Sequence, residues 1–177
     1  MNTNQKPSSP AAAAEAMGNH RLMPHLVCAG AAKAIAFYKE AFGATEMMRL
    51  PGPDGRLMHA CVVINGSPVM LTDEFPKMGN TAPTTLKGTP VTIHLIVDDV
   101  DALASKAISA GATIVMPVSD QFWGDRYGII ADPFGHHWSI ATPGKEPVSY
   151  EELQARAANM TFECGPDSPA AASGETR

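Results

Sequence analysis

Apolar and polar positions along the chain follow two periods, one typical of strands and one typical of helices. In the first half, apolar residues recur every three or four positions between residues 31 and 42, which predicts a helix with one buried face. Apolar segments bounded by turn residues predict strands around it. The expected elements are a strand over 22–28, the helix over 31–42, and strands over 44–50, 57–64 and 68–73.

The second half repeats this order. Asp98 and Asp99 are good N-cap residues for a helix that begins at Val100 and ends near Gly111. The flanking strands are expected over 91–97, 112–118, 126–131 and 137–142. Both halves therefore have the order strand, helix and three strands.

Short sequence matches support a duplication. Gly-Ala-Thr occurs at 43–45 and again at 111–113, each time between a helix and a strand. The strand before each helix carries one histidine, His25 or His94. Each copy alone is too short to bury a dependable core, so the two copies must pack together. We expect one α+β domain of two tandem βαβββ modules, 22–75 and 91–143.

The other segments are expected to be accessory. Residues 76–90 contain Pro, Gly and Thr without periodicity and predict a linker. A capping box from Ser149 to Glu152 predicts a short C-terminal helix over 149–160, which completes a domain over 21–164. The composition of residues 1–20 and 165–177 predicts disordered tails.

Charge and composition narrow the classes of partner. With 13 basic and 18 acidic residues the formal charge is −5, and the basic residues are scattered. No stripe for nucleic acid and no basic membrane-binding face is evident. The beginning of the chain has no long apolar core after a basic start, so we expect neither a signal peptide nor a membrane span. The three cysteines form no CxxC pair. These features favour a cytoplasmic protein with a small-molecule ligand.

Three segments resemble the vicinal oxygen chelate superfamily, which groups glyoxalases, bleomycin-resistance proteins and extradiol dioxygenases. They are FYKEAFGA at 37–44, VDDVDAL at 97–103 and WGDRYGIIADPFGHHWSIAT at 123–142. The PhnB-like branch of the superfamily is the most similar. The resemblance implies that each module curls its strands into a half-barrel and that the paired modules enclose a concave site. It also implies a homodimer, often with sites that two chains share.

The resemblance further implies where a divalent metal would bind, through four side chains from the first and last strands of the modules. The corresponding positions are Met23, Met70, Thr92 and Ser139. Methionine thioethers suit Cu(I) far better than Zn, Ni, Mn or Fe(II), and the hydroxyls of Thr92 and Ser139 are poor ligands for these divalent ions. We therefore predict no metal at the family's usual site and no cofactor.

Two histidines are the candidate catalytic residues. Strand alternation places His25 and His94 on the inward faces, two residues beyond a vacated metal position. With His137, or with an oxygen of Thr72 or Ser139, they could form a displaced site for a divalent metal. The alternative is that each is a hydrogen-bonded pocket histidine that contacts ligand. Either could act as an acid or base near neutral pH.

Other residues are candidates for ligand binding. Trp123 and Tyr127 could stack on a planar ligand while Arg126 pairs with an anionic group, or the same loop could be a turn whose charges pair locally. Met70, Thr72, His137 and Ser139 are expected to line the cavity. His59 is interpreted as a structural strand histidine and His136 is expected to face solvent.

Two classes of function follow. One is a binding protein of the bleomycin-resistance kind, which holds a small planar or anionic metabolite or drug in the inter-module cavity without the usual metal. The other is a lyase, isomerase or dioxygenase of glyoxalase type, in which a metal at a displaced His25 and His94 site stabilises an anionic intermediate. The absence of acidic ligands favours the first.

Overall fold

The computed structural model describes residues 22–159, so the tails expected at 1–20 and 165–177 lie outside the described residues. The first module has the predicted order of elements. They are β1 (His25–Cys28), α2 (Ala31–Phe42), β2 (Thr45–Pro51), β3 (Leu57–Ile64) and β4 (Ser67–Asp73).

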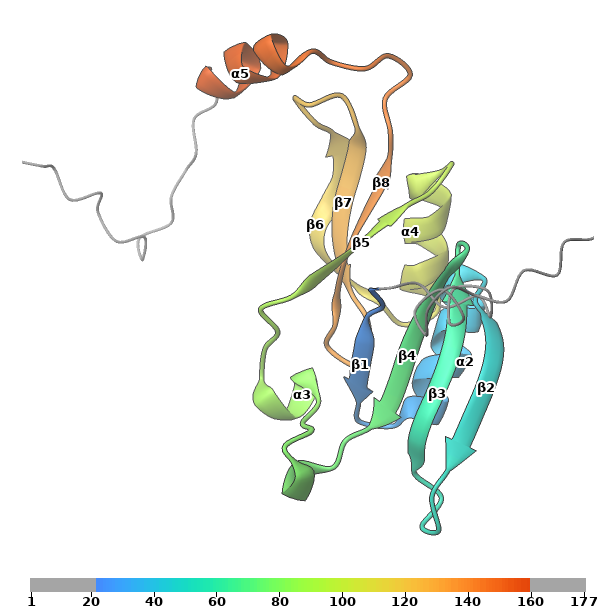
Figure 1. Cartoon of the computed structure of the whole chain (residues 1–177). Coiled ribbons are helices and arrows are strands. Elements are labelled where there is room, and N and C mark those ends of the chain that lie inside the picture. The colour runs from blue at the N-terminus through green and yellow to red at the C-terminus, as the bar shows by residue number, and fades with distance from the viewer. Residues whose placement is uncertain (1–21, 160–177) are drawn as a thin grey trace, which may run out of the picture.

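The second module repeats this order, and a short helix follows it. The elements are β5 (Thr92–Ile96), α4 (Val100–Ser109), β6 (Thr113–Asp120), β7 (Arg126–Ala131), β8 (His137–Thr142) and α5 (Tyr150–Ala158). As predicted, Asp99 caps α4 by accepting a 2.9 Å hydrogen bond from the N–H of Ala102. Ser149 caps α5 by accepting one of 3.2 Å from the N–H of Glu152. The prediction of two βαβββ modules with a C-terminal helix is confirmed (Figure 1).

Each module forms one mixed sheet, in the order β1-β4-β3-β2 or β5-β8-β7-β6. The first strand pairs with the last in parallel, and the other neighbours are antiparallel. In this register His25 lies beside Met70, and His94 lies beside Ser139. The two sheets therefore place their candidate histidines at equivalent positions.

The end of each module's last strand caps the helix of the same module. Asp73 Oδ1 accepts hydrogen bonds from the backbone N–H groups of Gly30 (3.1 Å) and Ala31 (2.8 Å) at the start of α2. Thr142 Oγ1 accepts a 2.9 Å bond from the N–H of Val100, the first residue of α4. Because the first N–H groups of a helix have no partner within it, these side chains fix each helix to its own sheet.

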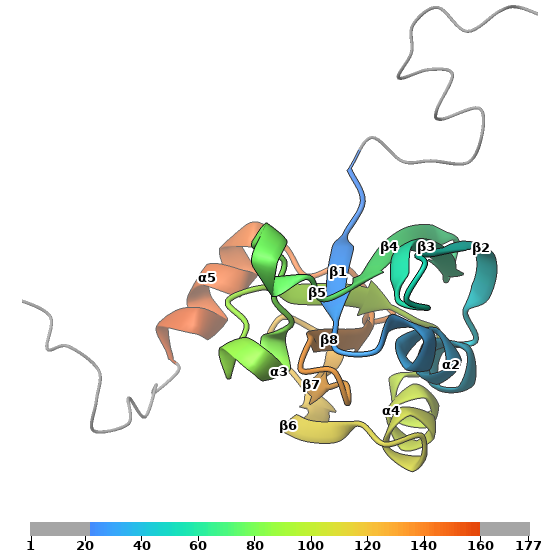
Figure 2. The ribbon, with the colours of Figure 1, turned by 90° about the horizontal axis from the view of Figure 1, so that it is seen from below.

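The two modules meet through their helices. Helices α2 and α4 lie side by side and contact each other (Figure 2). One buried apolar cluster continues from Leu26 in the first module to Ile140 in the second. His25 and His94 are exposed, because the sheet faces that carry them lie opposite the helices. The core thus lies between the modules on the helix side, and both candidate faces remain open.

A buried carboxylate, Asp132, links the modules at this contact. Its Oδ2 accepts hydrogen bonds from the Tyr38 hydroxyl of α2 (2.6 Å) and the Trp138 indole of β8 (3.0 Å). Its Oδ1 accepts from the backbone N–H groups of Phe134 and His136, both at 2.9 Å. Burial alone would raise the pKa of Asp132, but the nearby His136 ring and the bonds from Tyr38 and Trp138 lower it. The ionised form therefore stabilises the fold at neutral pH, and this contribution is lost as the pH falls below about 4.

His136 is buried, so the prediction that it faces solvent is wrong. Its exposed fraction is 7%. The reason lies in the linker, which contains a short helix, α3 (Pro83–Leu86), and a 3-10 turn, η1 (Pro76–Met78), that its irregular composition did not predict. Helix α3 covers the turn before His136, since a Cβ on Gly135 would come within 3.1 Å of Pro83. The His136 Nδ1 is 3.5 Å from Asp132 Oδ2 and lacks a hydrogen-bond partner.

Among residues 22–159 no helix is long and apolar enough to cross a membrane.

Replacing Tyr38 with Phe tests the link between the modules. The change removes a hydroxyl that donates to a buried carboxylate, so we expect the free energy of unfolding to fall by about 1.5–3 kcal/mol. Urea denaturation measures it. The matched control is Tyr150→Phe, because Tyr150 is 70% exposed, and its effect should stay below about 0.5 kcal/mol. Equal stability of Tyr38→Phe and the parent protein would show that this hydrogen bond does not join the modules.

Candidate functional site

On the open face of module two, a histidine and a serine form a polar pair. His94 Nδ1 and Ser139 Oγ are 2.9 Å apart and share a hydrogen bond between β5 and β8. His94 is exposed, whereas Ser139 is buried with an exposed fraction of 5%. The serine therefore orients a histidine ring whose other nitrogen can still reach a ligand.

Aromatic rings extend from this polar pair along β7 and the loop before it. The His94 and Tyr127 rings are stacked with centroids 6.2 Å apart. Tyr127 and Trp123 are 5.4 Å apart edge to face, and Trp123 and Phe122 are 5.0 Å apart in the same manner. The Trp123 indole N–H donates a 3.2 Å hydrogen bond to Asp125, which holds the ring in place. We call His94, Ser139, Tyr127 and Trp123 the module-two face.

His25, His59, Cys61 and Met70 form the module-one face, which is equivalent in position to the module-two face but carries different side chains. His25 and His59 lie edge to face with ring centroids 5.8 Å apart. Burial, and then the neighbouring His59, lower the pKa of His25, which is therefore neutral at pH 7. Cys61 Sγ lies 3.7 Å from Met47 Sδ, and Cys61 is the strand partner of Met70. This face thus carries imidazole and sulfur groups.

The strand registers relate the two faces residue by residue. Met70 pairs with Cys61 in the first sheet, and Ser139 pairs with Ile129 in the second. Two residues before each of these partners stand His59 and Tyr127, and each of them packs on its module's histidine. The interpretation of His59 as a structural residue therefore omitted its contact with His25. A single strand period could not reveal it, because the contact depends on the register between β1 and β3.

Arg126 lies apart from the module-two face. Its guanidinium donates to Asp101 of α4 (2.5 and 2.8 Å) and to Asp120 of β6 (3.0 Å). Adjacent strand residues point to opposite faces, so Arg126 lies on the helix side when Tyr127 lies on the open side. The expected local pair with Asp125 does not form, since Asp125 instead accepts from Trp123 and from the N–H of Gly144. The Arg126 guanidinium is thus already paired with carboxylates, on the sheet face opposite the aromatic rings.

Thr72 and His137 also lie away from the clustered rings. Thr72 is buried, and its hydroxyl is within 3.1 to 3.3 Å of the backbone oxygens of Leu57, Met58 and Asp73. The Thr72 hydroxyl therefore bonds to the backbone of its own sheet and has little hydrogen-bonding capacity left for a ligand. His137 is the strand partner of Thr92, two residues from Ser139 on β8, and is half-buried.

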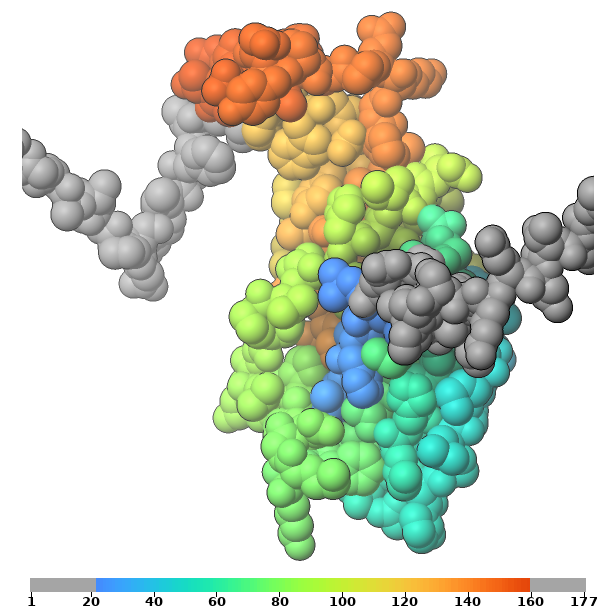
Figure 3. Space-filling view, in the orientation of Figure 1, coloured from blue at the N-terminus to red at the C-terminus, as the bar shows by residue number. Residues whose placement is uncertain are grey.

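Two pockets lie where the modules meet. One of about 380 Å³ is lined by β5 residues including His94, by Trp138, and by the hairpin residues around Asn65. The other, of about 250 Å³, is lined by His25, by His136 and by linker residues. The two candidate catalytic histidines therefore border different pockets. In Figure 3 the first module forms the lower part of the molecule, and the second module and α5 form the upper part.

The residues present do not fit the divalent metal of the family. Met23, Met70, Thr92 and Ser139 offer two thioethers and two hydroxyls, and Ser139 already bonds to His94. Within residues 22–159, no three His, Cys, Asp or Glu side chains gather closely enough to hold a metal ion. Divalent ions of the zinc and iron type need several such N or O donors.

Comparisons with known proteins agree with this fold. A family model described as the Glyoxalase/Bleomycin resistance protein/Dioxygenase superfamily matches residues 19–140, which is more than half of the chain. The chain therefore belongs to this superfamily.

Its relatives include bacterial proteins. It is 57% identical over 137 residues to the uncharacterized Mycobacterium bovis protein Mb0911c, covering 76% of this chain and 90% of that one. Among solved structures, PA1353 from Pseudomonas aeruginosa has 24% identity and a TM-score of 0.59, with 72% of this chain and 100% of that chain covered. The PhnB protein from Bacillus cereus has 17% identity and a TM-score of 0.55, with 70% of this chain and 99% of that chain covered. At these identities the two solved structures support the fold alone.

Metal content gives a direct check of the donor set. After incubation with Zn, Ni, Mn or Fe(II) and dialysis, we expect the protein to retain less than one metal ion per chain, because the required donors do not converge. Elemental analysis by mass spectrometry measures the ratio. Stoichiometric metal that disappears in the His25→Ala, His94→Ala double variant would instead establish a displaced site.

Proposed function

We propose that the protein binds a small planar metabolite or drug, without a divalent metal, on the module-two face. The observation that carries this proposal is the continuous row of rings from His94 through Tyr127 to Trp123, with the Ser139 hydroxyl at its polar end. Flat aromatic side chains hold flat ligands by stacking, and a few polar groups fix their orientation. An anionic group on the ligand is not required, because Arg126 is already paired on the far side.

A second copy of the chain would complete this site. Exposed apolar side chains lie on strands of both modules: Met47, Met48, Leu50, Met58, Ile96, Ile114 and Val115, each with an exposed fraction between 44% and 54%. Surfaces of this kind often mark interaction sites. A twofold dimer that places the module-one face of one chain opposite the module-two face of its partner would cover both and enclose a cavity. The homodimer is therefore part of the proposal.

The enzymatic alternative is a metal-dependent lyase, isomerase or dioxygenase of glyoxalase type. It needs a metal bound near His25 and His94, and across the described residues 22–159 no three His, Cys, Asp or Glu side chains gather closely enough to hold one. Binding without chemistry is thus the better supported function. A reducing, cytoplasmic location fits the free cysteines Cys28 and Cys61.

Tyr127 and its neighbour Arg126 provide a matched pair of substitutions with which to test ligand binding. A panel of planar metabolites and glycopeptide drugs is screened for compounds that raise the melting temperature of the parent protein, since binding to the native state raises its stability. For any such compound, we expect Tyr127→Ala or Trp123→Ala to weaken binding by about fivefold or more, as stacking on one aromatic ring is worth about 1 kcal/mol or more. Isothermal titration calorimetry measures the change.

The control is Arg126→Ala, which removes a side chain next to Tyr127 that points to the other face. Its ligand affinity should match that of the parent protein, and its stability should change by less than about 1 kcal/mol because its ion pairs are exposed. Ligand binding that is unaffected by Tyr127→Ala and Trp123→Ala, or that depends on Arg126, would contradict the proposed binding face.

A further inference from the structure

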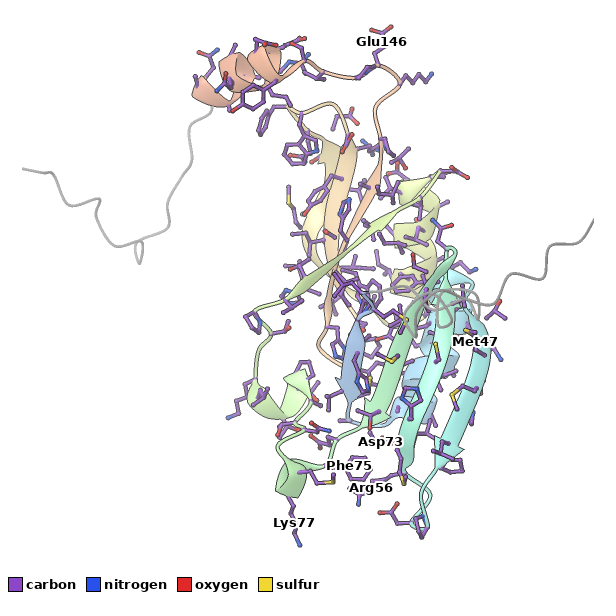
Figure 4. The ribbon with its side chains drawn as sticks, viewed as in Figure 1. Met47, Arg56, Asp73, Phe75, Lys77 and Glu146 are labelled. Carbon is purple, nitrogen blue, oxygen red and sulfur yellow. The ribbon has the colours of Figure 1, made fainter. Side chains whose placement is uncertain are left out.

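A row of metal-ligating side chains crosses the open face of module one, one from each strand of the sheet. His25 of β1 lies beside Met70 of β4, Met70 lies beside Cys61 of β3, and Cys61 contacts Met47 of β2. His59 adjoins the row through its contact with His25. Figure 4 shows Met47 on β2, where its side chain is 49% exposed, whereas Cys61 beside it is 7% exposed.

The two sulfur atoms are already spaced as ligands of one ion would be. Cys61 Sγ and Met47 Sδ lie 3.7 Å apart. Metal–sulfur bonds in proteins are about 2.3 Å long, so two sulfurs at that separation can share an ion with an angle of about 107° between the bonds. Their separation is therefore that of two ligands of one three- or four-coordinate ion.

The donor types select the class of ion. Thiolates and thioethers are soft ligands that favour Cu(I), whereas carboxylates and hydroxyls favour harder ions. The row has no carboxylate, and the imidazole of His25 adds a nitrogen donor beside Met70. Cys61 binds the ion as a thiolate, so its thiol proton passes to solvent as the metal–sulfur bond forms.

The second module provides an internal contrast. At the positions equivalent to Met70, Cys61 and Met47 it has Ser139, Ile129 and Val115, so the second sheet offers no sulfur at any of these three places. The row of metal-ligating side chains is therefore a feature of module one and does not follow from the shared fold.

We propose that the module-one row is a binding site for one soft monovalent metal ion, Cu(I), held by Cys61 Sγ and Met47 Sδ, with Met70 and His25 completing the ligand set. The proposal goes beyond small-molecule binding on the module-two face and does not depend on it.

Anaerobic titration of Cu(I) against a coloured Cu(I) chelator tests the site in the full chain. All proteins carry Cys164→Ser, which removes the cysteine outside the described residues. We expect one Cu(I) per chain, with Ag(I) as a second soft probe that competes for the same site. Cys61→Ser should lower the affinity by at least about a hundredfold and Met47→Leu by about tenfold, since even outer partners of a metal site contribute about ten- to a hundredfold.

Met116→Leu is the matched control, because it makes the same change on the corresponding strand of module two, where Met116 pairs with Ile129 and not with a cysteine, and it should leave Cu(I) affinity unchanged. Unchanged melting temperatures would show that Cys61→Ser and Met47→Leu remain folded. Failure of the parent protein to compete with the chelator, or Cu(I) binding that survives Cys61→Ser, would overturn the site. Neither result alters the expected binding of planar ligands, which is measured separately through Tyr127 and Trp123.

Discussion

The buried contact between Tyr38 and Asp132 determines how the two modules sit against each other. The hydroxyl belongs to the helix of module one and the carboxylate to the turn between the last two strands of module two. An ionised carboxylate in the interior is costly unless hydrogen bonds surround it, and four donors do so here. Separation of the modules would remove the Tyr38 donor from the buried carboxylate, so this contact favours the arrangement in which the two helices meet.

Joining the modules through their helices has a consequence for function. The core lies on the helix side, and the opposite faces of both sheets remain uncovered within one chain. These faces carry the histidines, the aromatic row and the sulfur row. A duplicated module has thus supplied two equivalent surfaces whose side chains now differ, one aromatic with a hydroxyl and one rich in sulfur. Neither has the donor set of the superfamily's divalent metal site.

Local patterns predicted most of the fold. Helix α2 and strands β3, β7 and β8 have the bounds expected from periodicity and turn residues, because each element's own side chains determine its pattern. Helix α3 and the burial of His136 were missed, since the cover on that turn comes from a distant segment. Of the candidate site, alternation predicted that His94 and Ser139 share the inward face, and the structure adds the contacts of Tyr127 and Trp123. The pairing of Arg126 with Asp101, 25 residues away, and the contact between His25 and His59 depend on tertiary packing that no local pattern encodes.

The mass of the protein in solution, measured by size-exclusion chromatography with light scattering, tests most directly whether the open faces of two chains form one site. The chain has a mass of 18.7 kDa. We expect a stable dimer of twice that mass, with ligand binding lost when the protein is diluted to the monomer. A monomer that binds a planar ligand with full affinity through Trp123 would contradict a site shared between two copies.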